Sequence, residues 1–434
     1  MEKDFASIGY YEPGFIHLRV NTDKSLSDIN KLKDDPSTIK YYSNFFHEYI
    51  HFLQDITTTH GLLNFINAIE HIRNSNKIIL QDAKSEFNIP LKQNNHYNLL
   101  TNTQLRKIYY GDSAYAEDVA YLSYKSHIEK VVTNIGETLD VDKYIIDYYD
   151  NKAQTKMHFH FGSRCIKEYM THALQNKLFP GTKHAAIPYN IVELIIQKEY
   201  PILLNDKSLI IALCDISLMS YHPAQFFFFN IERMKNETEW TPTDVDSIYR
   251  FAYDDLTFNH NGQVENVYSL YDKISNDALG CFKDSLAADI FQDNVAWFEE
   301  ILKEAKTLRF SSLEFFNHLV DSEGILSNKF ISILRKMGSP FMTNVLNEGF
   351  FMPPEKLLGL DIQPYYPKVF QAIILTYGGY KNCNLYDFCD SRKDKKITNS
   401  YCSTSPWLRI KEPEGCPYSL IWHTWGLDNK TPKF

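Results

Sequence analysis

The hydrophobic and polar positions along this chain repeat mostly with the spacing of amphipathic helices. Apolar side chains recur at intervals of three and four residues from about residue 37 to 57. The same period predicts further helices over 62–73, 114–135, 141–149, 190–200, 208–221, 224–234, 269–291, 295–308, 313–320 and 329–337. Residues 15–20 and 156–161 alternate with a period of two, which predicts short strands. We therefore expect a mainly α fold with a few short β-strands, of the α+β class.

The first long helix carries the stretch Phe46-His47-Glu48-Tyr49-Ile50-His51. Side chains four positions apart lie on one helical face, so His47 and His51 can present both imidazoles to one metal ion. Glu48 lies one step round the helix, where its carboxylate can act on a water beside that ion without being a ligand. Chance produces this pattern in roughly three such chains per hundred, so a helix with two ordinary histidines is the alternative interpretation.

A second group of candidate residues lies within 156–174. The predicted strand places His158 and His160 on one face, and a glycine then marks the turn into a helix. On that helix Glu168 and His172 are one turn apart and face the same way. A catalytic zinc ion takes three protein ligands and keeps a fourth position open, and two His with one Glu form such a set. A solvated surface pair of Glu168 and His172 is the alternative interpretation.

Together the two stretches resemble the zincin metallopeptidases, and their arrangement is similar to that of gluzincins. The resemblance implies that Glu168, on a separate downstream helix, is the third zinc ligand beside His47 and His51. It further implies that Glu48 is the general base of a zinc-dependent peptidase.

In gluzincins a polar residue four positions after the third ligand orients a metal-bound imidazole. His172 stands there in this chain, where the family more often has Asp, and it could itself be a ligand. His158 and His160 could line the cleft and stabilise the transition-state oxyanion, although an exposed strand face explains them equally well.

Three other histidines are weaker candidates. His60 stands nine residues beyond His51, whereas the metzincin pattern has its third His only six residues on. His222 precedes a proline at a helix junction, where a cap partner is the simpler interpretation. Glu314 and His318 repeat the Glu-x-x-x-His spacing with no partner motif and are expected to form a solvated pair.

The C-terminal tail contains four of the seven cysteines, namely Cys383, Cys389, Cys402 and Cys416. Zinc ribbons usually bring cysteines in as close pairs, and neither pair is close here. A structural zinc site made of these four thiols, with His423 as a substitute for one of them, is one hypothesis. Separate buried or free thiols are the other. The tail tryptophans Trp407, Trp422 and Trp425 are expected to pack the tail against the body.

Composition and charge exclude several classes of function. The chain has 45 Lys and Arg against 54 Asp and Glu, a net charge of −9, and no basic stripe for nucleic acid. Its amino terminus does not read as a signal peptide and its apolar runs are too short to span a bilayer, so we expect a cytoplasmic protein without membrane contact. Phosphate-binding loops, dinucleotide fingerprints and serine-nucleophile elbows are absent from the sequence. A di-iron bundle needs two Glu-x-x-His motifs, and only one was found.

The expected organisation is a zincin-like catalytic region over 1–235, a helical region over 247–365 and a tail over 366–434. The first functional hypothesis is a zinc-dependent hydrolase that cleaves a peptide or protein substrate, with one catalytic zinc ion and room for a possible second, structural ion in the tail. The second hypothesis is a metal-stabilised interaction protein, an inactive relative of peptidases, whose residues 247–365 bind a protein partner.

Overall fold

The computed structural model describes residues 9–91, 97–133, 136–237, 239–254, 256–260, 262–320, 328–392, 397–412 and 415–434. Helices predominate and the sheets are small, which confirms the predicted mainly α, α+β class. Most of the buried hydrophobic side chains belong to one cluster that extends from Tyr11 to Leu427. The amino-terminal and carboxy-terminal parts of the described chain therefore share one core.

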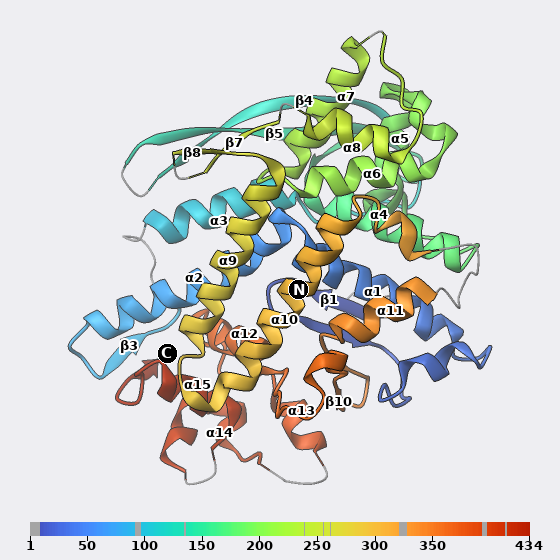
Figure 1. The fold of residues 1–434 in the computed structure, drawn as a ribbon. Helices are drawn as coiled ribbons and strands as arrows, with labels where there is room; N and C mark the ends of the chain where they lie inside the picture. Colours follow the sequence, from blue (N-terminus) through green and yellow to red (C-terminus); the bar gives the residue numbers. More distant parts are fainter. Residues whose placement is uncertain are drawn as a thin grey trace.

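Helix α1 (Ile39–Thr57) is the central element, and it contacts helices α2 (Thr59–Gln81), α4 (Ser163–Leu178) and α10 (Gln292–Ser311) (Figure 1). Its residues are buried without interruption from Phe45 to Thr57, because apolar residues lie on nearly every face. Such a helix runs through a core and does not lie on a surface.

The expected break between α1 and α2 is confirmed at Thr58, whose backbone is extended. The Thr58 hydroxyl caps α2 by accepting a hydrogen bond of 3.1 Å from the N–H of Gly61. A Cβ atom at Gly61 would lie 2.3 Å from the backbone of Asp55, so only glycine permits this close approach of the two helices.

A three-stranded antiparallel sheet covers one end of the molecule, at the top of Figure 1, where β4 and β5 form a long hairpin. Its strands are β4 (Val119–Val132), β5 (Thr138–Asp150) and β6 (Thr155–Phe161). The strand predicted over 156–161 is confirmed, because it coincides with β6.

The helices predicted over 114–135 and 141–149 are wrong, because β4 and β5 occupy these residues. In β5 the side chains of Tyr144, Ile146 and Tyr148 are buried at every second position, which is the pattern of a strand with one covered face. Aromatic and β-branched residues favour this conformation, and over so short a window their spacing also matches part of a helical period.

Helices fill the space between the sheet and the central helices. They are α5 (Ile191–Glu199), α6 (Lys207–Leu218), α7 (Pro223–Asn236) and α8 (Val245–Tyr253). α5, α6 and α7 confirm the helices predicted over 190–200, 208–221 and 224–234. His222 is the N-cap of α7, where its Nδ1 accepts a hydrogen bond from the N–H of Gln225, as the sequence suggested.

The following region consists of α9 (Val267–Ser285), α10 and α11 (Asn328–Met337), with a single short 3₁₀ turn where 313–320 was predicted as a helix. After α11 the chain completes an amino-terminal sheet of order β1-β2-β9-β10. These strands are Gly9–Glu12, His17–Val20, Phe341–Thr343 and Gly349–Phe350. β9 pairs with β2 in parallel, so residues more than 300 positions apart in sequence are hydrogen-bonded neighbours.

The tail folds against the first third of the chain. Its elements are α12 (Tyr366–Tyr377), α13 (Tyr386–Ser391), α14 (Tyr401–Thr404), α15 (Pro417–Thr424) and β11 (Thr431–Lys433). β11 pairs in parallel with β3 (Glu86–Asn88). Trp422 is fully buried, and the indole N–H of Trp425 donates to the carbonyl of Ser285 in α9. The smaller elements are α3 (Tyr97–Tyr110), β7 (Phe258–His260) and β8 (Gln263–Glu265).

Candidate metal centre

The structure brings His47, His51 and Glu168 together, although Glu168 is more than 100 positions away in sequence. Both histidines come from α1, and Glu168 comes from α4, which packs against it. One carboxylate oxygen of Glu168 lies 3.4 Å from Nε2 of His47 and 3.3 Å from Nε2 of His51. Within the described part of the chain, these residues are the one group with three possible metal-binding atoms within 4.8 Å of one another.

Two glutamines fix the orientation of the two imidazole rings. Nδ1 of His51 donates to Oε1 of Gln54 at 2.8 Å, and Nδ1 of His47 donates to Oε1 of Gln175 at 3.1 Å. An amide oxygen only accepts hydrogen bonds, so Nδ1 carries a proton in both rings and each Nε2 faces the Glu168 carboxylate. Hydrogen bonds of this kind support the ligands of protein metal sites.

The two amide groups are themselves held by further hydrogen bonds. The Gln54 amide N–H group donates to the carbonyl of Lys167 at 3.1 Å and to the hydroxyl of Thr171 at 3.2 Å. The Gln175 amide N–H group donates to the carbonyl and hydroxyl oxygens of Ser43. Each glutamine thus links α1 to α4 and cannot turn its oxygen away from the histidine without losing these bonds.

A buried ion pair fixes the two helices one turn further along. Nζ of Lys167 lies 2.5 Å from a carboxylate oxygen of Asp55, and both side chains are almost fully buried. Because Asp55 follows Gln54 and Lys167 precedes Glu168, this contact helps to set the register in which α4 meets α1. Breaking such a pair leaves an uncompensated buried charge, so the register is strongly preferred.

The Glu168 carboxylate is ionised in this environment. Burial raises its pKa, but the charges and hydrogen bonds of His51 and His47 outweigh burial and bring the pKa well below its usual range. Two imidazole nitrogens and one carboxylate oxygen form a donor set that zinc accepts. The residues present therefore fit a zinc ion.

Glu48 is buried, and its carboxylate lies close enough to His47, His51 and Glu168 for their charges to shift its pKa. Burial raises the pKa of Glu48, as does the charge of Glu168, while His47 and His51 lower it; the net shift is upward. The backbone N–H of Tyr11, in β1, donates a hydrogen bond to this carboxylate. A carboxylate with a raised pKa is better matched to proton transfer near neutral pH.

A turn after α4 contributes two aromatic rings that the sequence did not single out. The ring of His184 stacks on that of His47 at 5.8 Å, and its Nε2 lies 3.2 Å from Oε1 of Gln175. The centroid of the Tyr189 ring lies 4.4 Å from that of His184 and 6.2 Å from that of His47. Burial raises the pKa of Tyr189, as do the charges of Glu168 and Glu48, so its hydroxyl keeps its proton and can donate a hydrogen bond.

His172 lies next to this group without orienting either imidazole. Its ring is 4.5 Å from that of His184, and the Asn176 amide nitrogen lies 2.9 Å from its Nε2. Burial and the neighbouring His184 lower the pKa of His172 to about 3. The orienting contacts to the two histidines of α1 come from Gln54 and Gln175.

The other predicted histidines lie elsewhere. His158 is exposed on β6, and His160, two residues on, is buried and bonded through its backbone N–H to Asp112 at 2.8 Å. His60 is buried in α2, and Nε2 of His222 bonds to the carbonyl of Asp142. Among the described residues, the close group of three metal-binding atoms includes none of these histidines.

The remaining sequence candidates separate into a surface pair and a buried set. Glu314 and His318 form the expected pair, with 3.4 Å between Oε2 and Nε2 and the His half exposed. The four tail cysteines are all buried and line one small cavity. His423 does not line that cavity, and its Nδ1 bonds to the Asp428 carboxylate at 2.7 Å.

Comparison of the chain with protein-family models, with curated proteins and with solved structures finds no match. The assignment of the site therefore depends on its own geometry. Within the described residues, none of the helices combines the length and the apolar character that a membrane span requires.

Sequence reasoning missed the two orienting glutamines, His184 and Tyr189. Gln54 follows His51 by three positions and Gln175 follows Glu168 by seven, so both lie on the same helix faces as the ligand candidates. This spacing is a usable signal once the ligands are identified. His184 and Tyr189 precede and follow a proline-containing turn, and no periodicity marks them.

Proposed function

We propose that this protein is a zinc-dependent hydrolase, most specifically a metallopeptidase that acts on a peptide or protein substrate. The observation that carries the proposal is the convergence of two Nε2 atoms and an ionised carboxylate from two helices, with both Nδ1 atoms hydrogen-bonded to glutamines. Such support aims the two Nε2 atoms at one point, as a metal ligand set requires.

His47, His51 and Glu168 would hold the zinc ion. When bound, zinc polarises a substrate carbonyl and makes a water nucleophilic near neutral pH. Glu168 is ionised and ready for this role, and a proton on Nε2 of His47 or His51 would leave as the ion binds.

Glu48 would act as the general base and then as the general acid. Its carboxylate takes a proton from the attacking water and later gives a proton to the leaving amine. Its burial and raised pKa favour both transfers, because the protonated form is not strongly disfavoured. The Tyr11 N–H holds the carboxylate in place from the β1 side.

Tyr189 would donate a hydrogen bond to the developing oxyanion. Its hydroxyl keeps its proton and lies within the electrostatic reach of Glu48 and Glu168. A donor placed there stabilises negative charge that appears on the carbonyl oxygen. Tyr189 takes the place of His158 and His160 as the candidate for stabilising the oxyanion, because those two residues lie on β6.

The proposal includes the cytoplasm as the place of action and excludes nucleic acid as a substrate. All seven cysteines are free thiols in the structure, which suits a reducing compartment. The net charge of −9 opposes binding to a polyanion.

The test is Glu48→Gln, which keeps the shape and hydrogen-bonding capacity of the side chain but removes its basicity. We expect the variant to fold and to keep its zinc, while hydrolysis of a peptide library by the purified protein falls by about 10²–10⁴-fold. Equal turnover by the variant would contradict the mechanism. Absence of hydrolysis in the wild-type protein, with zinc present, would favour the metal-stabilised interaction protein.

A further inference from the structure

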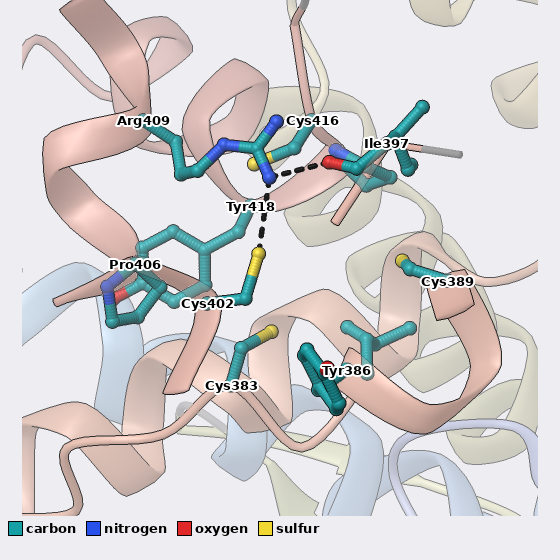
Figure 2. Close-up of a pocket in the computed structure, with 11 residues that line it drawn as sticks. Cys383, Tyr386, Cys389, Ile397, Cys402, Pro406, Arg409, Cys416 and Tyr418 are labelled. Atoms are coloured by element: carbon teal, nitrogen blue, oxygen red, sulfur yellow. Dashed lines mark hydrogen bonds between the residues drawn. The ribbon is translucent and has the colours of Figure 1, made fainter. Parts of the chain in front are cut away.

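Four cysteines of the tail surround one small buried cavity of about 20 Å³ (Figure 2). They are Cys383, Cys389, Cys402 and Cys416. Each is only 7–8% exposed, and the four are spread over the chain from the start of α13 to the start of α15. The backbone closes this loop, since the N–H of Cys383 donates to the carbonyl of Cys402 at 2.8 Å.

The segment around the cavity has little regular structure to hold it. α13 and α14 have six and four residues, and a 3₁₀ helix (Pro406–Lys411) joins α14 to the approach to α15. Helices this short are not stable by themselves. Segments that cannot build a sufficient core of their own are commonly stabilised by metal ions or disulfides.

A buried arginine adjoins the thiols. Arg409 is 2% exposed, and its Nη1 atom donates to Sγ of Cys402 at 3.0 Å and to the carbonyl of Ile397. Figure 2 shows its guanidinium group beside the sulfur atoms of Cys402 and Cys416. Its Nε atom also pairs with the Glu412 carboxylate at 2.6 Å. A thiolate bound to a metal ion accepts a stronger hydrogen bond from a guanidinium group than a thiol does, so Arg409 is placed to support a metal-bound cysteine.

The rest of the lining favours an ion over water. Apart from the thiols and Arg409, the cavity is bounded mainly by apolar or aromatic side chains, among them Leu385, Ile397 and Tyr418. A buried water needs two to four polar partners, which this wall does not supply. A volume of about 20 Å³ admits one ion.

We propose that the four tail cysteines bind one zinc ion as a tetrathiolate, separate from the metal centre of α1 and α4. The sulfur atoms of such a site lie about 3.8 Å apart, as Zn–S bonds of about 2.3 Å in a tetrahedron require. In this structure no three of them lie within 4.8 Å of one another, so the side chains rotate inward when the ion binds.

Binding releases the four thiol protons and involves no change of oxidation state. The resulting site carries two negative charges, and the guanidinium group of Arg409, which also pairs with Glu412 at 2.6 Å, lies beside them inside the fold. The ion would join α13, α14 and α15 at one point and stabilise the tail in the position where β11 meets β3.

The first arm of the test measures zinc in full-length protein purified under reducing conditions without chelator. We expect two zinc ions per chain in the wild type, one in His51→Ala, one in Cys402→Ala and none in the double variant. Cys281→Ala is the matched control, because this half-buried thiol contacts Glu70 far from the cavity, and it should keep both ions. Retention of zinc in Cys402→Ala at the level of the control would overturn the proposal.

The second arm needs no cysteine substitution, so it holds even if Cys402→Ala does not fold. Cobalt replaces zinc in His51→Ala, and we expect the intense sulfur-to-cobalt charge-transfer bands of a tetrahedral thiolate site. Absence of these bands, iron with inorganic sulfide in the purified protein, or the mass of two disulfides would each overturn the proposal. If the site on α1 and α4 does not bind zinc, the wild type and His51→Ala will contain equal amounts of zinc. That result differs from the one expected if the tail site is absent, in which Cys402→Ala contains as much zinc as the wild type.

Discussion

Gln175 on α4 accepts a hydrogen bond of 3.1 Å from Nδ1 of His47 on α1. The same relationship holds between Gln54 and His51 at 2.8 Å, so each candidate ligand on α1 has its own amide partner. These two bonds define the imidazole tautomers and turn an ordinary pair of helical histidines into an oriented pair of donors.

The glutamines should therefore determine metal affinity without touching the metal. We expect Gln175→Leu to lower zinc affinity by about 10–100-fold, because His47 loses the bond that fixes its ring. Competition with a chromophoric chelator measures the change. Gln175→Glu is the control, since its carboxylate also accepts from Nδ1 and should restore most of the affinity. Equal affinity in Gln175→Leu and wild type would show that the amide does not support a ligand.

Glu168→Ala should reduce zinc affinity as much as His51→Ala does, because each variant removes one of three donor atoms. Glu314→Ala is a matched control, since it removes the Glu of the same Glu-x-x-x-His spacing on the surface. Zinc content after dialysis against a weak chelator measures the difference. Loss of zinc in His51→Ala but not in Glu168→Ala would identify another residue as the third ligand.

The sequence alone was sufficient to group His47, His51 and Glu168 and insufficient for the side chains that support them. The two histidines of α1 are four residues apart on a strongly apolar helix, so local periodicity places them. Glu168 was predicted through chemistry and resemblance, and the packing of α4 on α1 brings it there. Gln54 lies one turn from His51 on the same helix, but the contact of Gln175 with His47 depends on the register between the two helices, which no local pattern contains.

The sheet shows why other elements were missed. Residues of β4 and β5 pair with each other along their whole length, and this pairing decides their conformation. Periodicity within one short window cannot detect a partner strand, so Tyr144 and Ile146 were assigned to a helix. The tail cavity is a similar case, because Cys383 meets Cys402 only through the fold.

A buried ion pair joins the helical region to the end of α1. Both side chains of Arg309 and Asp215 are fully buried, their closest atoms are 2.6 Å apart, and Arg309 also donates to the carbonyl of Thr57. We expect Arg309→Met to lower the free energy of unfolding by about 3–5 kcal/mol, because Asp215 is left buried without its counter-charge. Urea unfolding measures this.

The exposed pair of Arg250 and Asp246, also 2.6 Å apart, provides the control. Arg250→Met should change the free energy of unfolding by about 0–1 kcal/mol. Equal effects of the two substitutions would show that the buried pair contributes no more to the free energy of unfolding than the exposed pair does.

Acid should destabilise the protein partly through His60. Burial lowers the pKa of His60 to about 3, with Lys167 adding to the effect, whereas the unfolded chain has a His pKa of about 6.5. Below pH 6.5 His60 binds a proton in the unfolded state but not in the folded state. The free energy of unfolding therefore falls as the pH drops from about 6.5 to 3. Above pH 6.5 this contribution is constant.

His60→Gln should therefore have a shallower pH dependence of stability than the wild type between pH 7 and 4.5. Urea unfolding at a series of pH values, in the presence of chelator, measures the slopes. His127→Gln is the control, because that histidine is exposed on β4. Identical slopes in His60→Gln and wild type would contradict the assignment.

The most direct test of the central claim is anomalous diffraction at the zinc absorption edge from crystals of the wild-type protein. We predict a peak bonded to Nε2 of His47, Nε2 of His51 and a carboxylate oxygen of Glu168, with Glu48 close by and not coordinated. Crystals with zinc present in the protein but no peak between α1 and α4 would contradict the metal centre and the hydrolase built on it.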